Sequence, residues 1–181
     1  MRQCAINAVI LLFSVIFTVG FYCRAQNSQP TEYQIKAAFI YNFARFVDWP
    51  TQDFADASSP LIIGVLGKND FGFSLAQTIN GKTVYGHPLQ FKLLPSLSQA
   101  TNCQVLFIST SEKNHISKII STVRAASILT VGETDDFIAQ GGMIRLRIVD
   151  DKVRFDINNS AAKNAGLTIS SKLLTLAINV R

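Results

Sequence analysis

The sequence predicts a single α/β domain of three layers, in which helices cover both faces of a mostly parallel sheet and a C-terminal antiparallel hairpin forms one margin. Three observations lead to this prediction. Short apolar runs at 61–65, 103–108 and 127–131 are typical of buried parallel strands, and segments with helical periodicity separate them. Two runs that alternate apolar and polar residues follow at 144–148 and 153–157. The length of 181 residues, with 48% apolar and 16% charged content, fits one sizeable core.

Residues 1–25 are predicted to be a targeting segment. An uncharged apolar stretch follows the basic second residue, and Ala25 suits signal cleavage. We therefore expect a signal peptide at 1–25 and a periplasmic domain at 26–181. Because the apolar stretch is long enough to span a bilayer, an uncleaved N-terminal anchor is the alternative. Cleavage leaves Cys103 as the single cysteine, which excludes an internal disulfide. We expect this thiol to be a small buried hydrophobe, with a reactive thiol as the alternative and pairing between two chains as a third interpretation.

A long helix is predicted after the polar spacer, because Thr31-x-x-Gln34 has the pattern of a capping box. Apolar residues cover more than half of its circumference, so the helix is expected to be sandwiched deeply in the domain. It is expected to end at Trp49, because a proline follows and disfavours helical backbone before it. The narrow polar stripe contains Gln34, Asn42, Arg45 and Asp48, with Tyr41 among them.

Two aromatic residues of this helix, Tyr41 and Trp49, each have two interpretations. Tyr41 either contacts a partner or lies along the surface with its hydroxyl in water. Trp49 either caps the core or anchors a partner.

Three more helices are predicted between the strands. Asp70 is expected to cap a helix over 71–79, and residues 109–111 are expected to cap a helix that includes 116–123. The carboxylates of Glu133, Asp135 and Asp136 are expected at the N-terminus of a third helix, where negative charge is favourable. A metal site at this acidic cluster is the weaker alternative, since a divalent ion would need oxygen ligands from elsewhere.

Two further strand segments are predicted at 82–85 and 89–94, on either side of a turn that contains His87. His87 and His115 are both interpreted as surface residues. Neither has a second histidine or a carboxylate at the spacing of a metal site, so we predict no metal centre.

The C-terminal hairpin is predicted to turn at Asp150-Asp151. One face should be core, with Ile144, Leu146 and Ile148 opposite Val153, Phe155 and Ile157. The other face should be in water, with Arg145, Arg147, Arg154 and Asp156. A short helix is expected after it, from residue 161 to Gly166, and a second helix from residue 171 with an apolar stripe of Leu173, Leu174, Ala177 and Ile178.

Several function classes are excluded. Removal of the targeting segment leaves fifteen basic and twelve acidic residues without a basic run, so nucleic-acid binding is not expected. The sequence has no Gly-x-Ser-x-Gly and no Gly-x-Gly-x-x-Gly, and it contains two histidines, so an enzyme is not expected. Residues 64–69 have a spacing too short for a phosphate-binding loop, and we predict no cofactor.

The sequence resembles the YfiR family of periplasmic proteins. The similarity is carried by YQIKAAFIYNFARFVDWP at 33–50, ILTVGE at 128–133, GGMI at 141–144, RFDIN at 154–158 and AAKNAGLTISSKLL at 161–174. These blocks, with the apolar strands between them, span nearly all of the mature chain.

The resemblance implies a repressor that acts by binding. Members of this family hold down a membrane-bound diguanylate cyclase by contacting its periplasmic sensory domain, form dimers, and are drawn away by an outer-membrane lipoprotein. We therefore expect a homodimer whose partner is the periplasmic domain of an inner-membrane diguanylate cyclase, with a histidine kinase as another possible partner. Control by internal disulfides, which some relatives carry, is not expected with Cys103 alone.

Two functional hypotheses follow. The first is a regulatory protein that contacts its partner through Tyr41, Arg45 and Trp49 and through Arg145, Arg147 and Arg154, because aromatic residues and arginine dominate interface energetics. The second is a small-molecule-binding module that feeds a sensor kinase. Its pocket is expected beyond the carboxyl ends of the parallel strands, near Gly67, Ser109 and Gly132.

Overall fold

The computed structural model describes residues 30–56 and 58–181, and the predicted signal peptide lies outside them. Its centre is a seven-stranded sheet with the order β3-β4-β2-β5-β6-β7-β8. Strands β4 to β7 in this order are parallel, while β3 and β8 at the two edges are antiparallel to their neighbours. The bounds are β2 Leu61–Leu66, β3 Thr83–Val84, β4 His87–Leu94, β5 Val105–Ile108, β6 Leu129–Gly132, β7 Ile144–Val149 and β8 Lys152–Ile157. The predicted mostly parallel sheet with a C-terminal hairpin is confirmed.

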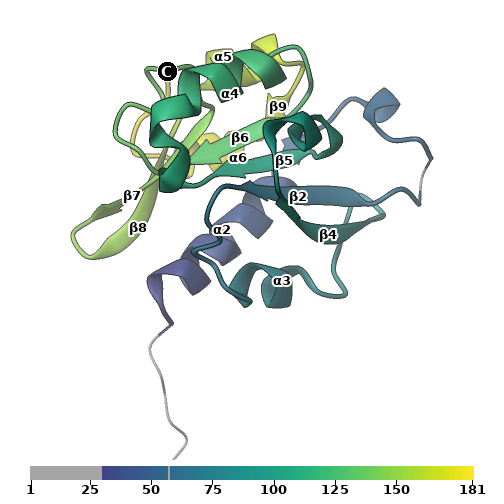
Figure 1. Ribbon diagram of the computed structural model, residues 1–181, viewed down its shortest axis with the longest axis horizontal. Coiled ribbons are helices and arrows are strands. Elements are labelled where there is room, and N and C mark those ends of the chain that lie inside the picture. Colours follow the sequence, from purple (N-terminus) through teal and green to yellow (C-terminus); the bar gives the residue numbers. More distant parts are fainter. Residues whose placement is uncertain (1–29, 57) are drawn as a thin grey trace, which may run out of the picture.

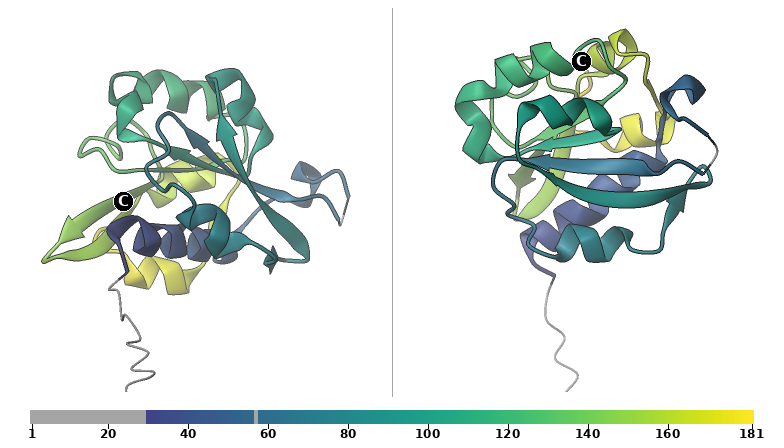
Figure 2. Two further views of the ribbon diagram at one scale, coloured as in Figure 1. Left: turned by 60° about the horizontal axis from the view of Figure 1, so that its bottom comes forward. Right: turned by 45° about the vertical axis from the view of Figure 1, so that its right-hand side comes forward.

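Helices cover both faces of this sheet, as predicted (Figures 1 and 2). One face packs against α2, α3 and α6, and the other against α4. The α-helices are α2 Glu32–Arg45, α3 Ser74–Ile79, α4 Ile116–Val123, α5 Asn159–Asn164 and α6 Ser171–Leu176, and short 3-10 helices occupy Thr51–Asp53, Leu97–Asn102 and Thr110–His115. No helix in the described part of the chain has the length and apolar character needed to cross a membrane.

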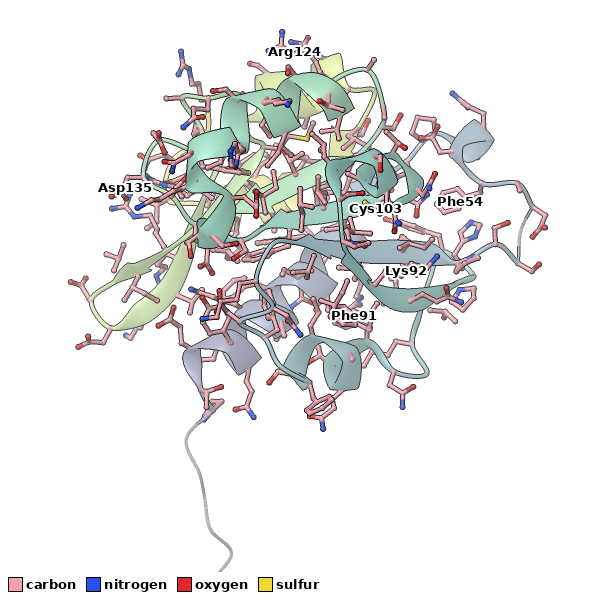
Figure 3. The ribbon with its side chains drawn as sticks, in the orientation of Figure 1. Phe54, Phe91, Lys92, Cys103, Arg124 and Asp135 are labelled. Carbon is pink, nitrogen blue, oxygen red and sulfur yellow. The ribbon has the colours of Figure 1, made fainter. Side chains whose placement is uncertain are left out.

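The central strands are almost entirely apolar because each of them faces two cores. In β2, Ile63 and Val65 belong to the cluster under α2, whereas Leu66 belongs to the cluster under α4. Strand β6 follows the same alternation, with one exception: Thr130 is a buried polar residue on the face that α4 covers. Cys103, just before β5, is buried and its thiol donates to the carbonyl of Ala100 at 3.0 Å (Figure 3). Its exposure of 3% confirms the interpretation as a buried hydrophobe, and burial raises the pKa of this thiol to about 12.

Helix α2 begins with the predicted capping box but ends earlier than expected. Thr31 accepts a hydrogen bond from the backbone of Gln34, and the Gln34 side chain accepts one from the backbone of Thr31. The helix stops at Arg45, because the next residues are recruited by a distant strand: β1 (Val47–Asp48) pairs antiparallel with β9 (Thr168–Ile169). The prediction of a helix that continues to Trp49 was therefore wrong.

The helix predicted after β6 does not form either. Residues 135–141 make successive turns. The ring of Phe137 packs between two glycines, where an added Cβ at Gly132 or Gly142 would lie 2.4 or 2.2 Å from it. Glu133 points inward instead of capping a helix. Its carboxylate pairs with the ammonium of Lys36 at 2.6 Å, and Lys36 is 4% exposed.

The cap predicted at Asp70 was also wrong, because α3 starts only at Ser74 and has no side-chain cap. The Asp70 carboxylate instead pairs with Lys68 at 2.9 Å and accepts a long hydrogen bond of 3.4 Å from the hydroxyl of Ser109.

The C-terminal segment folds largely as predicted. Asn158 caps α5, and Gly166 follows this helix with a φ of +76°. Helix α6 ends at Leu176, so Ala177 and Ile178 are not part of it. The chain leaves the helix there and runs along the base of β8, where the amide of Ile178 donates to the carbonyl of Phe155 at 2.9 Å.

Candidate functional site

The projecting hairpin carries the first group of residues predicted to contact a partner. Strands β7 and β8 are joined at Asp150 and Asp151, whose φ values of +49° and +56° fit a tight two-residue turn. Figure 1 shows that the hairpin extends beyond the rest of the sheet. Period-two alternation along the strands places Arg145, Arg147 and Arg154 on one face, as predicted.

The base of that face is not in water, contrary to the prediction. Asp156 is 4% exposed, and it accepts hydrogen bonds from Arg145 Nε at 2.9 Å and from Arg145 Nη2 at 2.6 Å. Asn179, in the segment along β8, donates to the other carboxylate oxygen at 2.7 Å. A paired carboxylate is the arrangement that makes burial of this charge tolerable.

This environment fixes the charge of Asp156. Burial tends to raise the pKa of its carboxyl group, but the hydrogen bonds from Asn179 and Arg145, together with the charges of Arg145 and Arg147, outweigh burial and hold the pKa below its ordinary value. Arg145 is only 14% exposed at its side chain and is already engaged by Asp156 and Asp135. Arg145 therefore joins β7 to β8 through Asp156 and contacts the turns after β6 through Asp135.

The outer part of the same face is open. Arg147 and Arg154 are direct partners across the ladder, which places two positively charged residues opposite each other on one face. Arg147 is 37% exposed at its side chain and lies 3.4 Å from the shared Asp156, while Arg154 is exposed. Like charges directly opposite are unfavourable in a sheet, so this pair gains free energy when an external carboxylate approaches. On the opposite face of the hairpin, Ile148 is exposed.

The second group of predicted contacts lies at the end of α2. The ring of Tyr41 is half-buried, with the Lys82 ammonium 4.2 Å and the Arg45 guanidinium 5.6 Å from its centre. Tyr85, which is exposed, donates its hydroxyl to the carbonyl of Arg45 at 3.1 Å. Lys82 and Tyr85 flank β3 and were not predicted to belong to this surface, because only the folded sheet brings β3 beside the end of α2.

Trp49 lies mainly in the core. It is 9% exposed, and its indole nitrogen donates to the carbonyl of Gln104 at 3.3 Å. One side of the ring lines a cavity of about 450 Å³ that also includes Phe54 and His87. These two rings stack with centroids 3.8 Å apart, so His87 is half-buried rather than the free surface residue that was predicted.

The structure does not bring the six predicted contacts into one surface. Tyr41 and Arg45 lie near β3, and the arginines of the hairpin lie on β7 and β8, at the other edge of the sheet. We name the first the α2–β3 surface (Tyr41, Arg45, Lys82 and Tyr85) and the second the hairpin surface (Arg147 and Arg154).

The pocket predicted at the carboxyl ends of the strands is found beside Gly67 but not beside Ser109 or Gly132. A cavity of about 380 Å³ at Gly67 is also lined by Leu66, Leu94 and Glu112. The remaining space at these strand ends is filled. Ser111 packs against Gly67, where an added Cβ would lie 2.4 Å from its hydroxyl, and Phe137 covers Gly132. Ser109 is 1% exposed. In the described part of the chain, no three His, Cys, Asp or Glu side chains are grouped as a metal site would require.

A second buried charge cluster joins α2 to the end of β6. Lys36 contacts the carboxylates of Glu32 and Glu133, and the Tyr33 hydroxyl donates to Glu133 at 3.2 Å. Burial, followed by the charge of Glu133, raises the pKa of Tyr33. The side chains of Lys36 and Glu133 are 5% and 9% exposed, whereas that of Glu32 is 49% exposed, so the Lys36–Glu133 pair has a structural role.

Comparisons with known proteins agree with this architecture. A family model described as YfiR/HmsC-like matches residues 33–178. No curated protein matches the chain significantly. Among solved structures, the chain is similar to a conserved domain protein from Vibrio cholerae, with 13% identity and a TM-score of 0.58 over 83% of this chain. It is also similar to an ABC domain in complex with L-Trp from Streptococcus pneumoniae, with 12% identity and a TM-score of 0.54 over 82% of this chain. The chain spans 60% of each of these structures, and at such identities the likeness concerns the fold alone.

Proposed function

Because the chain belongs to the YfiR/HmsC-like family, we propose that it is a periplasmic regulatory protein that binds the periplasmic sensory domain of an inner-membrane diguanylate cyclase and represses it. In this proposal the chain has no catalytic activity, and binding shifts the membrane protein between two states. We further propose that the chain forms a homodimer and that an outer-membrane lipoprotein binds it and withdraws it from the cyclase.

The observation that carries this proposal is the hairpin surface. Arg147 and Arg154 lie opposite each other on one face of the hairpin, and Asp156, the carboxylate 3.4 Å from Arg147, is 4% exposed. Arginine is enriched among the residues that contribute most to binding, and its planar guanidinium can bind a carboxylate through two hydrogen bonds. The partner should therefore present acidic side chains toward the hairpin.

The α2–β3 surface supports the proposal as a second contact area. Tyr41, Lys82 and Arg45 form a cation–aromatic stack that needs little ordering when a partner binds. Trp49 contributes by holding the end of β1 in place, because its indole is fixed inside the domain.

Calorimetry tests the proposal with the purified chain and the periplasmic domain of the diguanylate cyclase of the same bacterium. We expect Arg154→Glu and Arg147→Ala to weaken binding at least tenfold, and we expect added salt to weaken wild-type binding, because exposed charges are screened. Lys163→Ala is the matched control: it removes one exposed positive charge from α5 and should leave affinity unchanged.

Two results would overturn the proposal. One is the absence of binding to the cyclase domain by a chain that unfolds cooperatively. The other is equal affinity for wild type, Arg154→Glu and Arg147→Ala, which would remove the hairpin surface from the interface. A parallel titration with the periplasmic domain of a histidine kinase distinguishes the other predicted partner.

A second candidate function, small-molecule binding, is favoured by one observation: a cavity in the α4 layer that presents hydrogen-bond donors. Its location differs from the one predicted near Gly67, Ser109 and Gly132.

A further inference from the structure

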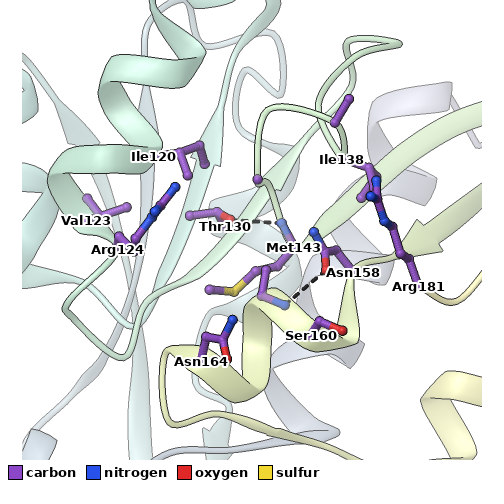
Figure 4. A pocket seen from close by; sticks show the side chains of 13 residues that line it. Ile120, Val123, Arg124, Thr130, Ile138, Met143, Asn158, Ser160, Asn164 and Arg181 are labelled. Carbon is purple, nitrogen blue, oxygen red and sulfur yellow. Dashed lines mark hydrogen bonds between the residues drawn. The ribbon is translucent and has the colours of Figure 1, made fainter.

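A cavity of about 370 Å³ opens between α4 and α5 (Figure 4). The segment between β6 and β7 forms turns here, and it contributes to the lining beside the two helices. Ile138, Ala139 and Gly141 of these turns form one wall.

The floor of the cavity is apolar. Ile120 and Val123 of α4 and Met143, just before β7, line it, and all three are at least 94% buried. An apolar floor of this kind is favourable for the hydrocarbon part of a ligand, because burial removes apolar area from water.

The polar groups at the floor present donors to the cavity. The Thr130 hydroxyl is 1% exposed and accepts a hydrogen bond from the amide of Met143 at 3.1 Å, which leaves its own proton free to point elsewhere. The Asn158 side-chain oxygen caps α5 by accepting from the amide of Ala161 at 3.0 Å. This bond turns the amide nitrogen of Asn158 toward the cavity, as Figure 4 shows. Within the described residues, neither the Thr130 proton nor this nitrogen has a hydrogen-bond acceptor.

The charged side chains of the lining are both positive. Arg124 at the end of α4 and Arg181 lie on opposite sides of the cavity in Figure 4, and no Asp or Glu lines it. The backbone of Arg181 is held by the amides of Asn159 and Ser160, which donate to its oxygen at 2.8 and 3.3 Å. Arg124 is exposed at the outer end of α4, where Figure 3 also shows it.

We propose that this cavity binds a small organic anion, namely a carboxylate with an apolar or aromatic body. The carboxylate is bound by Arg124 and by the Thr130 and Asn158 donors, because charge-assisted hydrogen bonds are the strongest of the available contacts. The body covers Ile120, Val123 and Met143. An inorganic anion alone would leave that floor uncovered. The site is independent of the hairpin surface, so the inference does not rest on partner binding.

Ligand series test the chemistry of the site. Acetate, phenylacetate and indole-3-acetate are titrated into the purified chain by calorimetry and thermal unfolding, beside phenylacetamide and phenethylamine. We expect affinity to rise from acetate to the aromatic carboxylates, and we expect the amide and the amine to bind at least tenfold more weakly than phenylacetate. The proposal would be overturned if none of the three carboxylates bound at about 10 mM, a concentration that detects even weak binding. It would also be overturned if phenylacetamide bound as tightly as phenylacetate.

Variants then test the location. Arg124→Ala should weaken phenylacetate binding at least tenfold, and its fold should be retained because the side chain is exposed. Lys163→Ala removes the same charge from α5 without lining the cavity and should change affinity less than twofold. Ala139→Trp should abolish binding by filling the cavity. Equal losses in Arg124→Ala and Lys163→Ala would indicate general charge attraction and would refute the site, as would unchanged binding by Ala139→Trp.

Discussion

Replacement of Asp156 should destabilise the domain in a graded and pH-dependent manner. At neutral pH its buried carboxylate receives two hydrogen bonds from Arg145, one from Asn179 and a long one of 3.4 Å from Arg147. Asp156→Asn keeps the shape of the side chain but removes the charge. Hydrogen bonds to charged groups contribute roughly 1.5–3 kcal/mol and neutral ones roughly 0.5–1.5 kcal/mol, so two weakened bonds to Arg145 predict a loss of about 2–3 kcal/mol. Asp156→Ala leaves Arg145 buried without this partner and should lose about 3–5 kcal/mol.

The pH dependence follows from the lowered pKa of Asp156. A carboxyl group whose pKa is lower in the folded than in the unfolded state contributes stability above its unfolded value, here 3.8, and loses it as the pH falls through the folded value. The difference in the free energy of unfolding between wild type and Asp156→Asn should therefore be full at pH 7 and should shrink below about pH 4.

Urea unfolding at pH 7, 5 and 3 measures these differences. Asp151→Asn is a matched control, because it makes the same chemical change at the exposed turn of the same hairpin, and we expect an effect within about 0.5 kcal/mol. If Asp156→Asn were as mild as Asp151→Asn at pH 7, or if its effect did not shrink in acid, the charge of the Asp156 carboxylate would not be what joins β8 to Arg145 and Asn179.

Two further predictions concern the interior. Lys36→Met should destabilise the domain by roughly 3–5 kcal/mol and Glu133→Gln by roughly 2–3 kcal/mol. In Lys36→Met the Glu133 carboxylate keeps only the Tyr33 hydroxyl, whereas in Glu133→Gln the Lys36 ammonium keeps Glu32. Urea unfolding of both variants and of the double variant should give non-additive losses, and strict additivity would exclude the pairing. Gly142→Ala should destabilise by about 1–3 kcal/mol through its clash with Phe137. Phe137→Leu added to Gly142→Ala should lose less than the sum of the two in thermal unfolding, and a full sum would argue against the clash.

The local patterns of the sequence were sufficient for much of the fold. Unbroken apolar runs predicted the parallel strands, because those strands face two cores. Alternation predicted the hairpin and placed Arg145, Arg147 and Arg154 on one face. The capping box of α2 formed as predicted, because it involves residues three positions apart. Each of these signals lies within one element.

The errors arose where a distant segment decides the local structure. Glu133 stands where a helix N-terminus was predicted, but Lys36, almost a hundred positions earlier, draws it into the interior. Val47 and Asp48 leave the helix because Thr168 and Ile169 pair with them. The cavity between α4 and α5 could not be predicted for the same reason, since residues far apart in the sequence line it. One signal was present, however: Thr130 is a polar residue within an apolar strand.

The order of the strands constrains how a partner binds. The hairpin surface and the α2–β3 surface lie at opposite edges of a seven-stranded sheet, so one small partner domain cannot cover both on the same chain. If substitutions at only one surface weaken binding, that edge is the interface. If Arg154→Glu and Tyr41→Ala both weaken it, two chains must contribute, one edge each, as a twofold-symmetric dimer would allow. In that case a heterodimer of the two single variants should have one intact site, made of the unchanged hairpin of one chain and the unchanged α2–β3 surface of the other. A chain that carries both substitutions has no intact site in its dimer, so it should bind no better than the weaker of the two single variants.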